Sequence, residues 1–150
     1  MKIDPTVEPL VRQALYAAVK ADVKLLDEAL KAFSDEKTRR AGLQLSAAIA
    51  LATLFDAHGG KPTNEDVGAA ANALAEISDW YGVTNVEAYR FLLALMDGRD
   101  VTTVLEPEKV VPYTFVLTAG LLAGSQSLKE GEWWFDLLDR IEAQLEATPD

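Results

Sequence analysis

The segment from residue 35 to residue 58 constrains the fold of this chain more than any other part of it. Its middle, Gly42 to Ala52, places apolar or small side chains on nearly every side of a helix instead of along one stripe. A helix of that kind is covered by neighbours on all sides, so we expect it at the centre of a bundle. Ser34 is the predicted N-cap, and Gly59–Gly60 supply a left-handed stop.

The other segments repeat their apolar residues at helical spacing, with capping and turn residues between them. Pro107 and Pro112 are expected to prevent one regular helix over their region, so the helix there is predicted to begin near Pro112. The predicted elements are residues 7–33 (one bent helix or two abutting ones, capped by Thr6), 64–81, 85–97, a short turn at 100–105, 112–124, and a last helix from 129–132 onward.

No segment has the alternating pattern of a convincing strand. No linker is long enough to divide the chain. The sequence therefore predicts an all-α fold: a single domain over residues 1–150, built as a bundle of six to seven helices around the central apolar helix at about 35–58.

The charge of the chain is strongly negative and unevenly distributed. The formal net charge is −10; residues 1–58 hold eight basic and eight acidic side chains, whereas residues 59–150 hold six and sixteen. Such a surface repels nucleic-acid phosphates and speeds encounter with basic partners, although it also serves plain solubility. We expect a protein partner with a basic surface, and no nucleic acid.

The chain lacks the side chains that most catalytic chemistry uses. It has no cysteine, and its one histidine, His58, precedes two glycines at a predicted helix end, where it suits the helix dipole better than a metal. The carboxylate pairs Glu76/Asp79 and Asp136/Asp139 lack the Glu-x-x-Glu pair that would complete a magnesium site. We expect no catalytic residue, no metal and no cofactor, and a protein that is not an enzyme.

The longest apolar stretches, residues 41–55 and 110–124, predict buried helices and not membrane spans. Each has about 15 residues interrupted by polar groups, and a span needs about 20. The first residues lack the apolar core of a signal peptide. Together with the absence of cysteine, this favours a cytoplasmic protein without membrane contact.

The segment Ser78 to Thr84 resembles the turn of a helix-turn-helix, after which Asn85, Glu87 and Arg90 would face nucleic acid. The single basic residue in that helix and the acidic flanks speak against this hypothesis. A helix stopped by Gly82, followed by one that Thr84 and Glu87 cap, explains the same residues.

The glycines Gly120 and Gly124 lie four residues apart in the helix predicted after Pro112. Glycines at this spacing allow helix backbones to approach one another closely. In a soluble chain they predict tight internal packing more often than a partner surface.

Three consecutive aromatic residues, Trp133-Trp134-Phe135, are the clearest sign of a functional surface. On a helix they sweep about 200°, which is wider than one core-facing stripe. Trp134 continues the apolar stripe of the last helix, so Trp133 or Phe135 is expected to be exposed, unless a wide groove covers the rings. The candidate partner-binding residues are these two aromatics and the nearby acids: Glu132, Trp133, Phe135, Asp136 and Asp139.

The sequence thus favours a non-enzymatic acidic helical protein that binds another protein, as an inhibitor, immunity, adaptor or assembly factor does. A small-molecule-binding or metal-dependent helical enzyme is the first alternative. A helix-turn-helix-like regulator is the second. A homo-oligomer that covers the aromatic residues with a second copy remains open as well.

Overall fold

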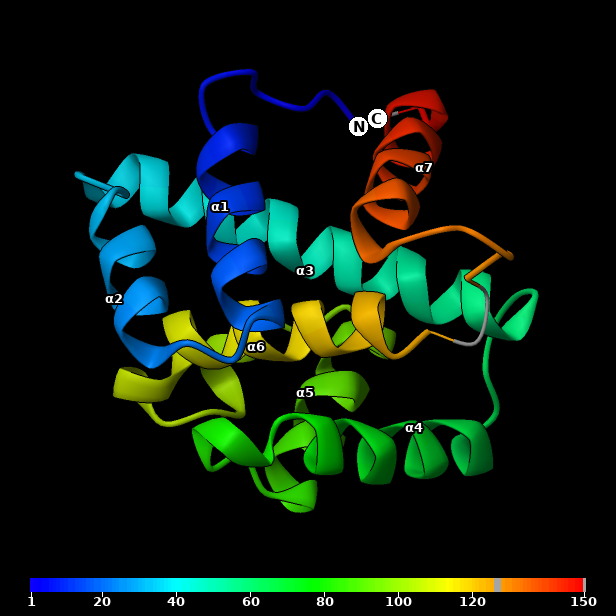
Figure 1. The fold of residues 1–150 in the computed structure, drawn as a ribbon. Helices are drawn as coiled ribbons and strands as arrows, with labels where there is room; N and C mark the ends of the chain where they lie inside the picture. The colour runs from blue at the N-terminus through cyan, green and yellow to red at the C-terminus, as the bar shows by residue number, and fades with distance from the viewer. Residues whose placement is uncertain (126–127, 150) are drawn as a thin grey trace.

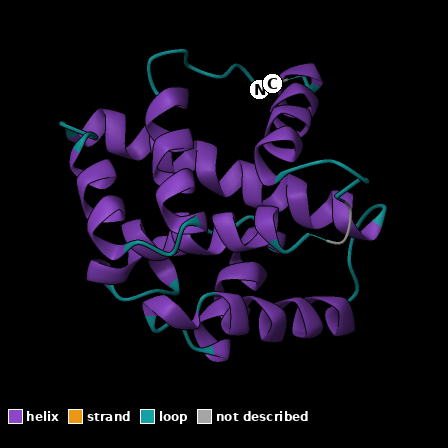
Figure 2. Ribbon diagram, in the orientation of Figure 1, coloured by secondary structure: helices purple, strands orange, loops and turns teal. Residues whose placement is uncertain are grey.

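A computed structural model describes residues 1–125 and 128–149 of the chain. Its described residues form seven α-helices and two short 3-10 helices and contain no strand (Figures 1 and 2), which confirms the predicted all-α bundle. The helices are α1 Glu8–Val19, α2 Val23–Lys31, α3 Glu36–His58, α4 Asn64–Ile77, α5 Asn85–Met96, α6 Pro107–Ala123 and α7 Trp134–Ala147; the 3-10 turns are η1 Asp79–Tyr81 and η2 Val101–Thr103.

The central helix α3 has the predicted bounds, but a different residue caps it. The carboxylate of Asp35, not the hydroxyl of Ser34, accepts a hydrogen bond from the Thr38 backbone N–H at 2.7 Å. Gly59 ends the helix in the left-handed conformation, with φ of 66°, as predicted. A carboxylate at this position also complements the positive end of the helix dipole, which a serine hydroxyl does not.

Helix α6 shares the centre of the bundle with α3. It begins at Pro107, so the predicted start near Pro112 is wrong, and Pro112 lies inside the helix. Pro107 occupies the first helical position, where its missing N–H costs nothing. Pro112 follows soon after and removes one backbone hydrogen bond near the start, and the packing of α6 on α1 and α3 outweighs that loss.

The two ends of the chain also differ in detail from the prediction. Val7, not Thr6, is the N-cap of α1, and Thr6 instead donates hydrogen bonds to the carboxylate of Asp4. The segment 7–33 forms two abutting helices, which is one of the two predicted alternatives, and they divide at Ala21, whose φ is 56°. The last helix begins at Trp134, later than the predicted 129–132, because the backbone of Trp133 is extended.

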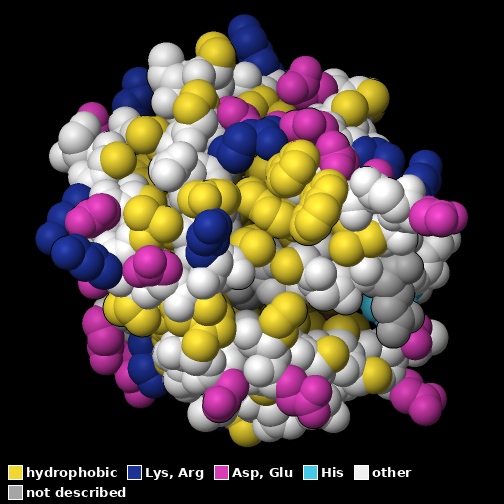
Figure 3. Space-filling model, in the orientation of Figure 1, with side chains coloured by type: hydrophobic (Ala, Val, Ile, Leu, Met, Phe, Trp, Pro, Cys, Tyr) yellow, Lys and Arg dark blue, Asp and Glu magenta, His cyan; other side chains and the backbone are white. Residues whose placement is uncertain are grey.

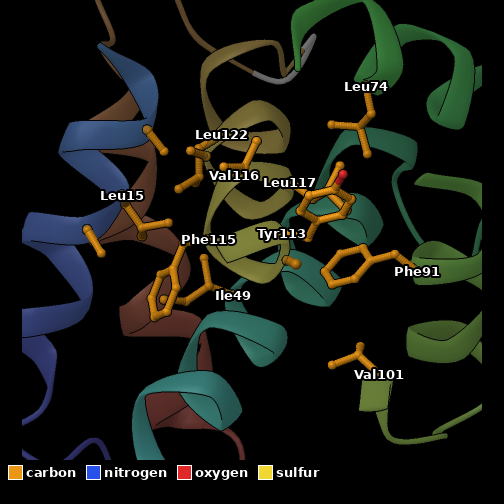
Figure 4. Close-up of a cluster of buried hydrophobic side chains, with 14 of the residues drawn as sticks. Leu15, Ile49, Leu74, Phe91, Val101, Tyr113, Phe115, Val116, Leu117 and Leu122 are labelled. Atoms are coloured by element: carbon orange, nitrogen blue, oxygen red, sulfur yellow. The ribbon is translucent and has the colours of Figure 1, made fainter. Parts of the chain in front are cut away.

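The helices are arranged in layers around the α3–α6 pair (Figure 1). α1 and α7 pack on one side of this pair, and α4 and α5 lie on the other. Leu15 of α1, Ile49 of α3 and Phe115 of α6 point toward one another in the core (Figure 4). The ring of Phe33 lies 5.5 Å from that of Phe115, measured between centroids. No described helix is both long and apolar enough to cross a membrane.

Candidate functional site

The start of α7 presents an exposed aromatic surface. Trp133 is 67% exposed and Phe135 is 42% exposed. These are the two largest exposed fractions among the aromatic side chains in the described part of the chain. Trp134 is half-buried against the core and meets Phe135 edge-on, with ring centroids 5.9 Å apart. Figure 3 shows this face, with hydrophobic side chains gathered over the start of α7 and charged groups of both signs around them. We call Trp133, Trp134 and Phe135 the aromatic ridge.

Trp133 is exposed because of its backbone position, and not because it lies on the outer side of a helix, as the sequence predicted. It is the N-cap of α7, with φ −97° and ψ 169°, and so it lies outside the helix. Asp136 accepts a hydrogen bond from the Trp133 backbone N–H at 2.9 Å. This bond fixes the backbone that carries the indole while leaving the ring itself uncovered.

Glu132, the second acid of the predicted site, is held by a bridge to α3. Its carboxylate pairs with Arg140 of α7 at 3.0 Å, and the same guanidinium contacts Asp56 of α3 at 2.9 Å. The hydrogen bond from Arg140 holds the pKa of Glu132 below its ordinary value. Glu132 therefore anchors the loop before the ridge, and it shares one cation with Asp56.

Asp139 contacts α1. Its carboxylate, 65% exposed, pairs with Arg12 at 2.7 Å. Arg12 also pairs with Glu8 at 2.7 Å and with Glu142 at 3.0 Å, so three carboxylates surround one guanidinium where α1 meets α7. Burial, followed by repulsion from Glu8, raises the pKa of Glu142 to about 7. Of the five predicted site residues, the structure thus leaves the two aromatics open and ties the three acids into the fold.

A second feature, which the sequence did not reveal as a site, is a cleft of about 390 Å³ between α3, α4 and α6. Figure 3 shows the surface hollowed between α4 and the helices above it. Gly120 lies on its α6 side, where an added Cβ would come within 2.9 Å of Leu74 and 3.1 Å of Ile77. The glycine pair therefore does serve internal packing. The cleft itself could not be found without the placement of α4 relative to α6.

Two of the three residues of the helix-turn-helix hypothesis form contacts within the fold. Asn85 donates to Asn72 of α4 at 2.6 Å, and Glu87 caps α5 and pairs with Lys109 at 2.9 Å. Within residues 1–125 and 128–149, no three histidine or carboxylate side chains converge as ligands for a metal ion.

Comparison with known proteins adds no relative to these observations. No protein-family model, no curated protein and no solved structure gives a match to this chain.

Proposed function

We propose that this chain acts by binding another protein, with Trp133 and Phe135 as the anchors that enter an apolar pocket on the partner. The partner would be a protein whose pocket is bordered by Lys and Arg side chains. Inhibitors, immunity proteins, adaptors and assembly factors act in this way. Such binding requires no catalytic residue.

The exposure of the two rings is the observation that carries the proposal. Tryptophan is the residue most enriched among interface hot spots, and covering a ring that is 67% exposed removes a large apolar area from water. The supports around the rings lower the entropic cost of docking. Asp136 fixes the Trp133 backbone, and the edge of Trp134 restricts Phe135.

The charge around the ridge supports a basic partner. Residues 128–149 carry two basic and six acidic side chains, a formal charge of −4. Arg140 and Arg12 balance some of these acids, but the excess remains negative. A field of this sign speeds encounter with a basic surface, and added salt weakens the effect.

Site-specific photocrosslinking tests what covers the ridge. We would place a benzoyl-phenylalanine at position 133 and, as the matched control, at Tyr89, an exposed aromatic on α5 that is 36% exposed. We expect position 133 to crosslink to a protein other than a second copy of this chain, and position 89 not to crosslink to that protein. Crosslinks from both positions to the same set of proteins would contradict it.

A second copy of the chain is the alternative occupant. Light scattering of the purified protein over a range of concentrations distinguishes the two. A monomer whose tryptophan fluorescence a neutral quencher reduces supports a separate partner. A stable dimer with protected tryptophans would overturn the proposal.

The cytoplasmic location stays a prediction, which cell fractionation tests.

A further inference from the structure

The cleft between α3, α4 and α6 has the size and lining of a small-molecule site. Its volume of about 390 Å³ lies within the range of about 300–1,000 Å³ that is typical of ligand pockets. Most of the lining is alanine, leucine, isoleucine and glycine, and it includes no Lys or Arg. An apolar cavity of about 150 Å³ holds one benzene, so this cleft has room for a body of about two fused rings.

The polar groups lie where α3 ends and α4 begins. His58 closes α3, and its Nδ1 donates to the Leu54 carbonyl oxygen at 2.8 Å, since a carbonyl only accepts. In the neutral ring this leaves Nε2 as an acceptor. Asp66 adds a carboxylate, whose Oδ2 accepts from the Thr63 backbone N–H at 2.9 Å. That hydrogen bond lowers the pKa of Asp66, so the group is an anion at neutral pH.

The charge of the surrounding chain has the same sign. From residue 59 to residue 89 there are five acidic side chains and one basic side chain, Lys61, which does not line the cleft. The positive end of α4 already has two carboxylates of its own, Glu65 and Asp66, in its first turn. An anionic ligand would therefore meet like charge from the carboxylates at the polar end, whereas an ammonium group would meet opposite charge.

We propose that this cleft binds a small amphipathic cation, with an apolar body of about two rings between α4 and α6 and its ammonium group toward Asp66 and His58. The site is separate from the aromatic ridge and is not needed for protein binding.

The test is a titration of the whole protein followed by NMR of its backbone amides. The probe is 2-(1-naphthyl)ethylamine, and its matched anion is 1-naphthylacetate, which has nearly the same shape. The proposal predicts that the amine shifts amides of α3, α4 and α6 that border the cleft, and that it binds at least about tenfold more tightly than the acid.

Two variants test the two parts of the site separately. Asp66→Asn keeps an oxygen for the Thr63 N–H but removes the charge. We expect it to weaken amine binding about tenfold, and not to weaken binding of the acid, which then meets one like charge fewer. Ala70→Leu fills the cleft and should weaken both probes. Its control is Ala75→Leu, a half-buried alanine on α4 that instead lies beside the α4–α5 connection.

Three results would each overturn the proposal. They are no binding of the amine, equal binding of amine and acid, and shifts in amides remote from the cleft. The double variant Trp133→Ala/Phe135→Ala should bind the amine as the unaltered protein does. This separates the outcome for the cleft from the outcome for the proposed protein-binding function.

Discussion

Glu142 provides the sharpest test of the contact between α1 and α7. Its side chain is only 12% exposed, and one oxygen accepts from Arg12 at 3.0 Å. The other oxygen, Oε2, is buried without a hydrogen-bond partner. Burial and the neighbouring Glu8 raise the pKa of Glu142 from 4.5 to about 7. The folded protein therefore holds a proton at Glu142 over a pH range in which the unfolded chain has lost it.

The sign of the pH dependence follows from this difference in bound protons. Between pH 4.5 and about 7 the folded state binds more protons at Glu142, so the free energy of unfolding falls as pH rises. Above pH 7 the loss is complete. At about 1.4 kcal/mol per pKa unit the full effect is about 3 kcal/mol. Glu142→Gln keeps the shape and an acceptor for Arg12 but has no charge, so it should be about 1–3 kcal/mol more stable than the unaltered protein at pH 8.

Urea unfolding followed by circular dichroism, at intervals from pH 5 to pH 8, measures this effect. The control is Glu146→Gln, which removes an exposed carboxylate one turn further along α7. We expect Glu142→Gln to flatten the fall in stability and Glu146→Gln to leave it unchanged. If Glu142→Gln lost stability with pH as steeply as the unaltered protein, or were the less stable at pH 8, the reasoning about this cluster would be refuted.

Further substitutions test other contacts by the same urea measurement. Gly42→Ala should destabilise the fold by about 1–3 kcal/mol, since its Cβ would lie 2.4 Å from the buried ring of Phe33. Gly68→Ala, with open space around it in α4, should stabilise the fold by about 0.5–1 kcal/mol. If Gly42→Ala and Gly68→Ala changed the free energy of unfolding in the same direction, the packing described here would be contradicted. Arg140→Met leaves two carboxylates without their shared cation and should cost about 1–3 kcal/mol; an unchanged free energy of unfolding would show that the bridge does not stabilise the fold. Trp133→Ala should cost less than about 1 kcal/mol, and a larger loss would mean that the ring is structural.

Local signals predicted the helices well because capping chemistry acts over a few residues. The Thr84 and Glu87 pair forms the expected capping box at α5, with Glu87 accepting from the Thr84 backbone N–H at 3.1 Å. Pro112 led to a wrong prediction of where α6 begins, since packing on two neighbouring helices compensates for the one hydrogen bond that the proline removes. Tertiary contacts of this kind are not visible in local sequence.

The candidate site was predictable only in part, for the same reason. The excess of aromatic residues indicated that Trp133 or Phe135 is exposed, and both are. Two of the contacts around the nearby acids join residues far apart in sequence: Arg12 is 127 residues from Asp139, and Arg140, the partner of Glu132, also pairs with Asp56, 84 residues away. Spacing along the chain cannot reveal such pairs. The cleft likewise depends on how α4 lies against α6.

Calorimetry of the chain with the partner that crosslinking identifies measures how much Trp133 and Phe135 contribute to binding. Trp133→Ala/Phe135→Ala is compared with the unaltered chain and with Tyr89→Ala, the exposed aromatic on α5. We expect at least about 30-fold weaker binding for the double variant, which corresponds to the loss of one hot spot of about 2 kcal/mol, and a change within about twofold for the control. A folded double variant that binds within twofold of the unaltered chain would contradict the claim that the aromatic ridge is the anchor.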